Sequence, residues 1–219
     1  MTRPTAITSL PRDGTCARLL HRLTAVAIVA AFSFSASMSF ALKVGEPAPG
    51  FSATTSAGMT TSLADHAGKT VVLEWTNHDC PYVRKHYDSG TMQRLQKDAT
   101  DDGIVWLSVI SSRPGSQGHV TAKAANTLTT SRDAHPTAVL LDERGEIGKQ
   151  YGARTTPHMY IVDVDGKLVY QGGIDDKRSP SLSTLAEATP YVREALAQLG
   201  QGEPIASATT RPYGCSVKY

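Results

Sequence analysis

The cysteines carry the most reactive chemistry in this 219-residue sequence. Cys80 follows an apolar segment and precedes Pro81, a residue that the first turn of a helix tolerates. A thiol at that position meets unpaired backbone N–H groups and the positive end of the helix dipole, which favour the nucleophilic thiolate. The sequence therefore predicts that Cys80 is the reactive centre.

Cys215 is the second candidate, and it lies in a C-terminal segment that contains two prolines and two glycines between residues 201 and 219. Its thiol could attack a mixed disulfide or a sulfenic acid formed on Cys80. A permanent disulfide that pins the tail is an alternative, worth on the order of 4 kcal/mol for a loop of this length. No pairing at all is the third arrangement, because the sequence sets no distance between the two sulfur atoms.

The first 41 residues predict export. Four arginines precede an apolar run over residues 23–34, and small residues follow up to Ala41. This order is typical of a secretory signal peptide that is cleaved after Ala41. The alternative is an uncleaved membrane anchor, which the apolar run is too short to favour, since a spanning helix needs about 20 residues. We expect a periplasmic protein without stable membrane insertion.

Removal of residues 1–41 changes both the charge and the cysteine content. This segment holds four of the 22 basic and one of the 20 acidic residues, so the remainder has a formal charge of −1. The remainder has no basic cluster that would predict nucleic-acid binding. Cys16 is also removed, which leaves Cys80 and Cys215 in a compartment that permits disulfide chemistry.

Two apolar segments predict the buried strands that would position the reactive cysteine. Residues 70–76 and 104–110 are almost continuously apolar and rich in β-branched side chains, which is typical of strands covered by helices on both faces. Asp165-Gly166 favours a two-residue type I′ turn between two later strands. The remaining strands are predicted at 138–141, 159–164 and 167–172, with a small hairpin within 51–62.

Helical segments alternate with these strands and indicate an α/β fold. The first has a break at Ser89-Gly90, and the last is amphipathic. The helices are predicted over residues 81–99, 119–128 and 182–199. We therefore expect one domain over residues 42–200, a mixed sheet flanked by helices with an N-terminal extension, followed by an irregular tail.

Two separated motifs resemble the thioredoxin superfamily. The first is VVLEWTNHDCPYV at residues 71–83, and the second is Thr155-Thr156-Pro157 followed by strand, Asp-Gly and strand. The opening VGEPAPGF and the long insert at 104–137 are closer to the redoxin branch, which includes the alkyl hydroperoxide reductase/thiol-specific antioxidant peroxiredoxins. The tail RPYGCSVKY is similar to that of a bacterial peroxiredoxin-like subgroup.

The resemblance implies a role for several residues. Cys80 matches the nucleophile of the family, and Pro157 matches a cis-proline that faces it. Thr156, together with Thr76 and Pro81, would shape the substrate groove.

This sequence also departs from both family motifs. Val83 stands where a thioredoxin has its second cysteine, and Asn77 stands where a peroxiredoxin has a threonine that orients the peroxide. Thr76 lies one position earlier. Cys80 therefore has no local partner to resolve a mixed disulfide, and Cys215 is the candidate resolving thiol.

Four polar residues are candidate modulators of Cys80. His78 and Arg84 can add positive charge near the thiol, although Arg84 can equally belong to a solvated helix face. Glu74 interrupts an apolar strand; if buried, its pKa would be raised and it could relay protons, and otherwise it points to solvent. His158 follows the expected cis-proline and either faces the thiol or lies on the strand surface.

The leading functional prediction is an exported thiol–disulfide oxidoreductase with Cys80 as nucleophile and Cys215 as resolving thiol. Its partners would be a protein or small-molecule thiol or disulfide and an external thiol reductant, with no metal or organic cofactor. A thiol peroxidase with antioxidant activity is the first alternative. The others are a copper-binding module that uses Cys80 with His78, His86 or His158, and a redox-inactive binding module.

Overall fold

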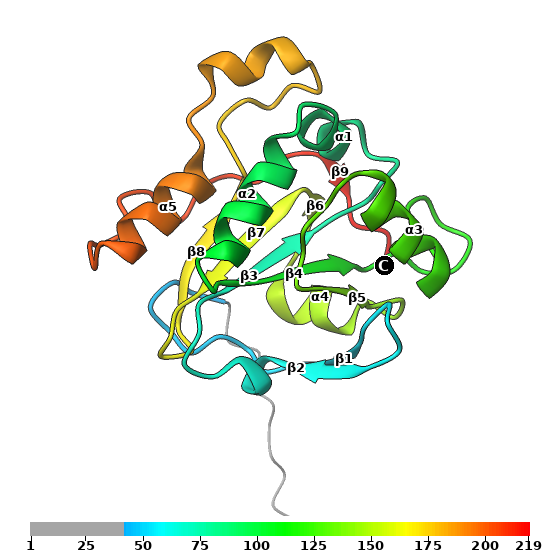
Figure 1. Ribbon diagram of the computed structural model, residues 1–219, viewed down its shortest axis with the longest axis horizontal. Coiled ribbons are helices and arrows are strands. Elements are labelled where there is room, and N and C mark those ends of the chain that lie inside the picture. The colour runs from blue at the N-terminus through cyan, green and yellow to red at the C-terminus, as the bar shows by residue number, and fades with distance from the viewer. Residues whose placement is uncertain (1–41) are drawn as a thin grey trace, which may run out of the picture. The chain divides into compact units, whose positions relative to one another are not determined.

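A computed structural model describes residues 42–219, and the predicted signal peptide lies outside the described residues. Within that range, no helix is both long and apolar enough to cross a membrane. The described chain forms a central sheet of five strands with helices against both faces (Figure 1).

The central sheet is mixed, as the sequence predicts. Its strand order is β5-β4-β3-β7-β8, with β3, β4 and β5 parallel and β7 and β8 antiparallel to their neighbours. All five residues of β3 are buried, which explains why its pattern is apolar at every position except Glu74. The strands are β3 (Val71–Trp75), β4 (Val105–Ile110), β5 (Ala138–Leu141), β7 (His158–Val162) and β8 (Leu168–Gly172).

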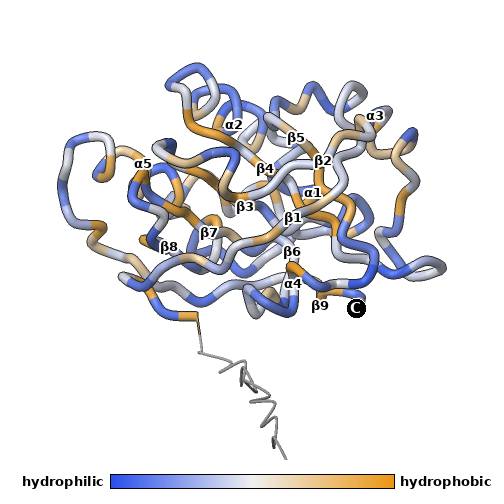
Figure 2. Tube along the Cα trace, turned by 90° about the horizontal axis from the view of Figure 1, so that it is seen from below, coloured by the Kyte–Doolittle hydropathy of each residue, from blue (hydrophilic) through white to orange (hydrophobic). Residues whose placement is uncertain are grey.

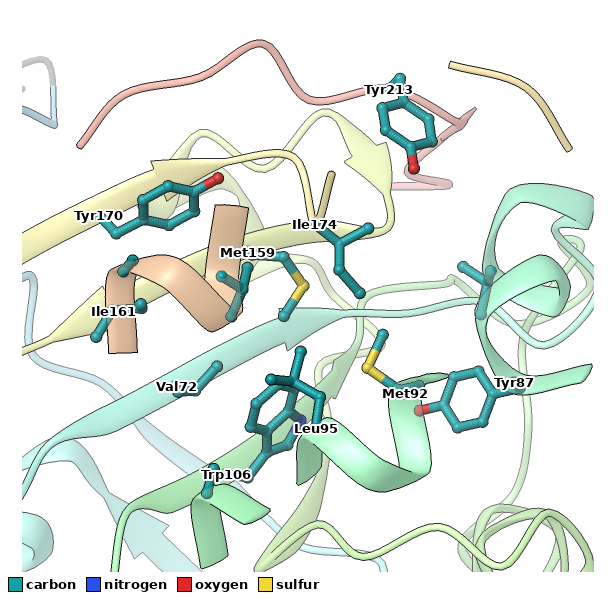
Figure 3. Packing of buried hydrophobic residues seen from close by; sticks show 14 of the residues in the cluster. Val72, Tyr87, Met92, Leu95, Trp106, Met159, Ile161, Tyr170, Ile174 and Tyr213 are labelled. Carbon is teal, nitrogen blue, oxygen red and sulfur yellow. The ribbon is translucent and has the colours of Figure 1, made fainter. Parts of the chain in front are cut away.

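Alternate residues of the strands enter two separate core clusters. Val72 and Trp106 face α1 (Pro81–Asp88), α2 (Thr91–Asp101) and α5 (Tyr191–Gly200), and Cys80 belongs to this cluster. Figure 3 shows this cluster, in which the hydroxyl of Tyr87 points from α1 toward Trp106 on β4. The opposite face packs against α4 (Glu146–Tyr151).

The predicted break in the first helix is confirmed. α1 ends at Asp88 and α2 begins at Thr91. Gly90 lies between them with φ of +70°, a backbone conformation that glycine adopts without steric cost. The break lets α1 and α2 pack on the same face of the sheet.

The single helix predicted over residues 182–199 is wrong. The chain instead forms a 3₁₀ segment, η2 (Leu182–Glu187), followed by α5. Pro190 separates the two, because a proline disfavours helical backbone in the residue before it. The helix predicted over 119–128 is displaced, since α3 spans Ala122–Ser131 and is capped by the Thr121 side chain, which accepts from the Ala124 amide. α4 was not predicted because it has only six residues.

The turn between β7 and β8 also differs from the prediction. A type I′ turn needs positive φ at both central residues, but among the described non-glycine residues only Asp133 has positive φ. The Gly166 amide donates to the Asp163 carbonyl, and the Asp163 amide donates to the Lys167 carbonyl. The turn is therefore one residue longer, and Gly166 occupies the left-handed position.

The N-terminal extension forms the small hairpin that the sequence predicts. β1 (Ser52–Thr54) pairs antiparallel with β2 (Thr60–Ser62), and the 3₁₀ segment η1 (Leu63–His66) follows. In Figure 2, the apolar stretches of β3 and β7 run through the middle of the molecule, whereas the tail passes beside α4. The tail is mostly irregular, as predicted, but Cys215–Ser216 form a short strand, β9, against β6 (Thr155–Thr156).

Candidate active site

Cys80 is the N-cap residue of α1, and Pro81 occupies the first turn. The thiol is fully buried. The loop before it is held by Asn77, whose side-chain oxygen accepts from the Asp79 amide at 2.9 Å, while the Asn77 carbonyl accepts from the Cys80 amide at 3.0 Å. The strand-to-helix junction thus fixes the sulfur at the end of the helix where the dipole is positive.

The second motif lies directly against this sulfur. The Thr156–Pro157 peptide bond is cis, as the resemblance implies. The Cys80 Sγ donates a hydrogen bond to the Thr156 carbonyl oxygen at 3.1 Å. Thr156 is buried, and its hydroxyl has no hydrogen-bond partner. The fold therefore brings together two segments that are 76 positions apart in the sequence.

The C-terminal tail completes the site. In the antiparallel β6–β9 pair, Cys215 lies opposite Thr156. The backbone amide of Cys215 donates to the Cys80 Sγ at 3.4 Å. Both cysteines are free thiols in this structure. The fold therefore places the two cysteines, which are 135 positions apart in the sequence, next to each other.

The last residues of the tail are anchored on both sides of the cis-proline segment. The Val217 amide donates to the Arg154 carbonyl at 3.1 Å, and the Arg113 amide donates to the Lys218 carbonyl at 3.0 Å. The Tyr219 hydroxyl donates to a backbone carbonyl at 2.5 Å. In Figures 1 and 2, β9 lies beside β6. This docking covers Cys80 and explains its burial.

The surroundings of Cys215 oppose the loss of its proton. Burial raises the pKa of Cys215, and the hydrogen bond to Cys80 and the negative charge of Cys80 raise it further, to about 12. Lys218 opposes this effect weakly. While Cys80 carries a thiolate, Cys215 is therefore held as the neutral thiol.

A buried polar cluster that sequence reasoning missed holds the tail in place. Tyr213 inserts its ring beside α1, and its hydroxyl donates to a carboxylate oxygen of Asp175. The same hydroxyl accepts from Lys85 Nζ at 3.2 Å and contacts His86 Nε2 at 3.1 Å. All four side chains are buried. Lys85 and His86 are adjacent in a helical segment, but the sequence carries no signal that Asp175 and Tyr213 meet them.

The charges in this cluster are partly balanced. Lys85 Nζ lies 3.6 Å from an Asp175 carboxylate oxygen. Burial lowers the pKa of Lys85, and the Asp175 carboxylate opposes that shift. Burial, together with the Lys85 ammonium, lowers the pKa of His86 to about 3, so this imidazole is neutral at physiological pH. The cluster is a buried ion pair bridged by a tyrosine hydroxyl.

Glu74 is fully buried, so the alternative that it points to solvent is wrong. It lies on the same face of the sheet as Val72, the face that packs against α1. One carboxylate oxygen accepts from the Tyr87 hydroxyl at 2.9 Å. The other accepts from Gln96 Nε2 at 2.9 Å, Trp106 Nε1 at 2.9 Å and Ser108 Oγ at 3.1 Å. Burial raises the pKa of Glu74, and the four donors lower it in part.

A small cavity adjoins this network. Its volume is about 40 Å³, and its walls include Thr76, Tyr87 and Ser108. The Thr76 hydroxyl is buried and has no hydrogen-bond partner. A cavity of this size has room for a water molecule, although most of its lining is apolar, and two of its lining residues, Tyr87 and Ser108, are also donors to Glu74.

The remaining predicted modulators do not converge on the thiol. Arg84 is exposed and forms an ion pair with Asp88 at 3.8 Å. His78 pairs with Asp79 at 3.3 Å, and burial lowers the pKa of His78 while Asp79 opposes the shift. His158 is buried against the ring of Tyr160, in the cluster on the opposite side of the sheet from Cys80.

The structure does not assemble the ligands expected of a copper site. Within residues 42–219, no three or more His, Cys, Asp or Glu side chains are grouped closely enough to hold a metal ion. His86 faces Tyr213, and His158 accepts from the Arg154 amide at 3.3 Å. The histidines named with Cys80 are thus separated by the fold.

The mixed five-stranded sheet, the cysteine at a helix N-terminus and the opposing cis-proline define a thioredoxin-like protein. The model of the AhpC/TSA family matches residues 44–171 of this chain, and the chain belongs to that family. The match spans the extension, Cys80 and the cis-proline, and ends before the tail.

The chain is also similar to a thioredoxin-like protein and to two solved structures of the same fold. The thioredoxin-like protein YneN of Bacillus subtilis (strain 168) is 30% identical over 127 residues, covering 58% of this chain and 69% of the relative. A crystal structure of an uncharacterized conserved protein from Geobacillus kaustophilus has a TM-score of 0.71 at 27% identity and covers 81% of this chain and 93% of its own. A hypothetical protein from Sinorhizobium meliloti 1021 has a TM-score of 0.69 at 19% identity, covering 82% and 96%.

Proposed function

We propose that this protein is a thiol–disulfide oxidoreductase in which Cys80 is the nucleophile and Cys215 is the resolving thiol. The observation that carries the proposal is the contact between the Cys215 amide and the Cys80 sulfur at 3.4 Å. Family membership supports redox chemistry, since the AhpC/TSA family model matches the segment that contains Cys80 and a relative of this chain is a thioredoxin-like protein.

The raised pKa of Cys215 gives the order of the reaction. The Cys80 thiolate attacks a substrate disulfide, an S–S bond forms to Cys80, and one substrate thiolate leaves. Cys80 is then neutral, so its charge no longer raises the pKa of Cys215. Cys215 loses its proton and attacks the Cys80 sulfur, which releases the second substrate thiolate and leaves the Cys80–Cys215 disulfide. An external thiol reductant returns both cysteines to thiols.

Glu74 has the properties of a proton carrier for these steps. It is a buried carboxyl with a raised pKa on the face of the sheet that contains Cys80. The cavity beside Tyr87 and Ser108 adjoins its hydrogen-bond donors. A carboxyl whose pKa lies closer to neutrality exchanges protons more readily at physiological pH. We include Glu74 in the site as the group that accepts or returns the thiol proton.

The proposal is tested with the two cysteine variants and glutathione disulfide as substrate. Cys80→Ser should abolish glutathione release. Cys215→Ser should still release one glutathione per protein and should then stop at a mixed disulfide on Cys80, seen by mass spectrometry. Full turnover by Cys80→Ser would refute the assignment of the nucleophile, and full turnover by Cys215→Ser would refute the assignment of the resolving thiol.

Peroxide reduction is a second candidate, supported by the complete burial of Cys80 beneath the tail. A hydroperoxide is small enough to reach a covered sulfur. The thiolate would attack the peroxide oxygen, giving a sulfenic acid and an alkoxide or hydroxide that takes up a proton from water, and the Cys215 thiol would then form the disulfide and release water. Against it, the Asn77 amide is bonded to Asp79 and Gln117. Stopped-flow oxidation of Cys80 at the rate of a free thiol would exclude this activity.

Export is part of the proposal. Residues 1–41 have the basic, apolar and small-residue order of a signal peptide, and a periplasmic location would supply the oxidising conditions under which a two-cysteine cycle operates. N-terminal sequencing of the protein recovered from the periplasm tests this. A mature protein that begins at Leu42 is the expected result, and retention of Met1 would contradict it.

A further inference from the structure

Tyr213 differs from the rest of the tail. Of residues 201–219, it alone is buried, with 6% of its surface exposed. It precedes the resolving cysteine by two positions. Other tail residues pack only partly buried side chains against the core, such as Cys215 and Val217, whereas Tyr213 places a complete aromatic side chain into the core beside α1. In Figure 3, its hydroxyl points inward from the tail segment.

The Tyr213 side chain is held by two charged side chains, Asp175 and Lys85, and by one aromatic ring. Asp175 accepts a hydrogen bond from the Tyr213 hydroxyl, and Lys85 donates one to it at 3.2 Å. The Lys85 ammonium also lies 5.1 Å from the centre of the Tyr213 ring. On the other side, Tyr82 packs edge-on at 5.9 Å between ring centres. Buried charges are costly unless they are paired and hydrogen-bonded. Removal of the Tyr213 hydroxyl would therefore take one hydrogen bond from Asp175 and one from Lys85.

Gly214 joins Tyr213 to the resolving cysteine, Cys215, and its backbone lies in close contact with the cis-proline segment. Its φ is +128°, and a Cβ at this position would lie 1.9 Å from the Thr156 carbonyl oxygen. The backbone therefore passes directly over Thr156, the residue whose carbonyl accepts from Cys80. With Tyr213 fixed on one side and Gly214 pressed against the cis-proline segment, the position of Cys215 is determined.

We propose that Tyr213 is a positioning residue, a latch that holds Cys215 against Cys80 and raises the effective concentration of the resolving thiol. This inference rests on the proposed function, since it assumes that the two cysteines react. A tail tethered only by a flexible linker gives effective concentrations in the millimolar range, whereas an ordered tail has already lost that conformational freedom.

The effective concentration is measured against glutathione. The Cys80 thiolate attacks glutathione disulfide, forming a mixed disulfide and releasing one glutathione thiolate. Cys215 then displaces the second glutathione and forms the internal disulfide. The equilibrium ratio of internal disulfide to mixed disulfide, multiplied by the glutathione concentration, reports how well Cys215 is held. The first step alone is measured in the Cys215→Ser background.

Tyr213→Phe is compared with Tyr151→Phe, which removes the hydroxyl of another buried tyrosine that bonds to the Pro49 carbonyl at 2.7 Å, away from the latch. We expect Tyr213→Phe to lower the effective concentration at least about tenfold. Tyr151→Phe should change it less than about twofold. In the Cys215→Ser background, Tyr213→Phe should form the mixed disulfide at the same rate or faster.

Gly214→Ala provides an independent disruption of the same contact and should also lower the effective concentration. The latch is refuted if Tyr213→Phe and Gly214→Ala both retain the wild-type value, or if Tyr151→Phe falls as far as Tyr213→Phe. If the wild-type protein forms no Cys80–Cys215 disulfide with glutathione, the proposed function itself fails. The two failures are therefore distinguishable from one set of measurements.

Discussion

The buried carboxylate at Glu74 can be replaced in two ways that differ in what they leave to its four donors. Glutamine retains one oxygen, which can accept from Gln96, Trp106 and Ser108 as the present Oε2 does. Its amide nitrogen then faces the Tyr87 hydroxyl, which can rotate and accept instead of donating. Leucine retains the volume but removes the acceptor of Tyr87, Trp106 and Ser108, whereas Gln96 keeps the Tyr87 hydroxyl as an acceptor at 3.1 Å.

The magnitudes follow from that difference. A buried donor left without a partner costs about 1–3 kcal/mol. Glu74→Leu should therefore lower the free energy of unfolding by at least about 3 kcal/mol, even at the lower limit for each of the three donors. Glu74→Gln should change it by less than about 1 kcal/mol below pH 4.5, where the carboxyl of the wild type is protonated, because the hydrogen bonds are re-formed.

The pH dependence separates the two charge states of Glu74. Its pKa is raised in the folded protein above the usual value of 4.5, so the folded state binds a proton that the unfolded state releases. The stabilisation from the protonated form is complete below pH 4.5 and is lost as the pH rises through the folded pKa. In this window, the stability of the wild type relative to Glu74→Gln should fall by up to about 1.4 kcal/mol per pH unit.

Urea denaturation of the wild type and both variants over a pH series measures these quantities. Titration of other groups cancels in the difference between wild type and Glu74→Gln. A difference that stays constant or increases with pH above 4.5 would show that the pKa of Glu74 is not raised. Equal losses of stability for glutamine and leucine would show that the four hydrogen bonds do not hold the carboxylate.

Three further predictions concern the C-terminal tail and the residues that contact it. Cys80→Ser removes the hydrogen bond and charge that help to raise the pKa of Cys215, so the alkylation of Cys215 by iodoacetamide should begin at lower pH. An unchanged pH profile of this alkylation would contradict the prediction. Lys85→Met leaves Asp175 buried without its cation and should cost about 3–5 kcal/mol in urea denaturation, part of which Asp175→Asn should restore. Gly145→Ala places a Cβ 2.2 Å from the final aromatic ring, so β9 amides should exchange hydrogen faster, and unchanged protection would show that the ring moves freely.

The fold was predictable where burial imposes a simple pattern. The sequence predicts β3 and β4 because both faces of each strand are covered, which gives an almost continuous apolar run. The break at Gly90 was found because glycine is readily recognised at a helix boundary. The single helix predicted over residues 182–199 is wrong because the apolar spacing continues across Pro190 although the helix does not.

The site was predictable only in part, for a physical reason. Cys80 and Pro157 belong to local motifs, so their positions follow from the segments that carry them. The contact of Tyr213 with Lys85 and Asp175 depends on how the tail packs, and no local spacing encodes it. Buried charges of this kind resemble surface residues in a sequence, because their partners are distant along the chain.

The pairing of β9 with β6 has a consequence for selectivity. A polypeptide that approached Cys80 by pairing with Thr155 and Thr156 would compete with the protein's own tail for the same backbone groups. Its apparent dissociation constant is the intrinsic value divided by the fraction of molecules in which the tail is released. Each 1.4 kcal/mol of tail docking would weaken such binding about tenfold. Small disulfides that reach the sulfur without displacing β9 escape this penalty, so the stability of tail docking sets the preference between small and polypeptide substrates.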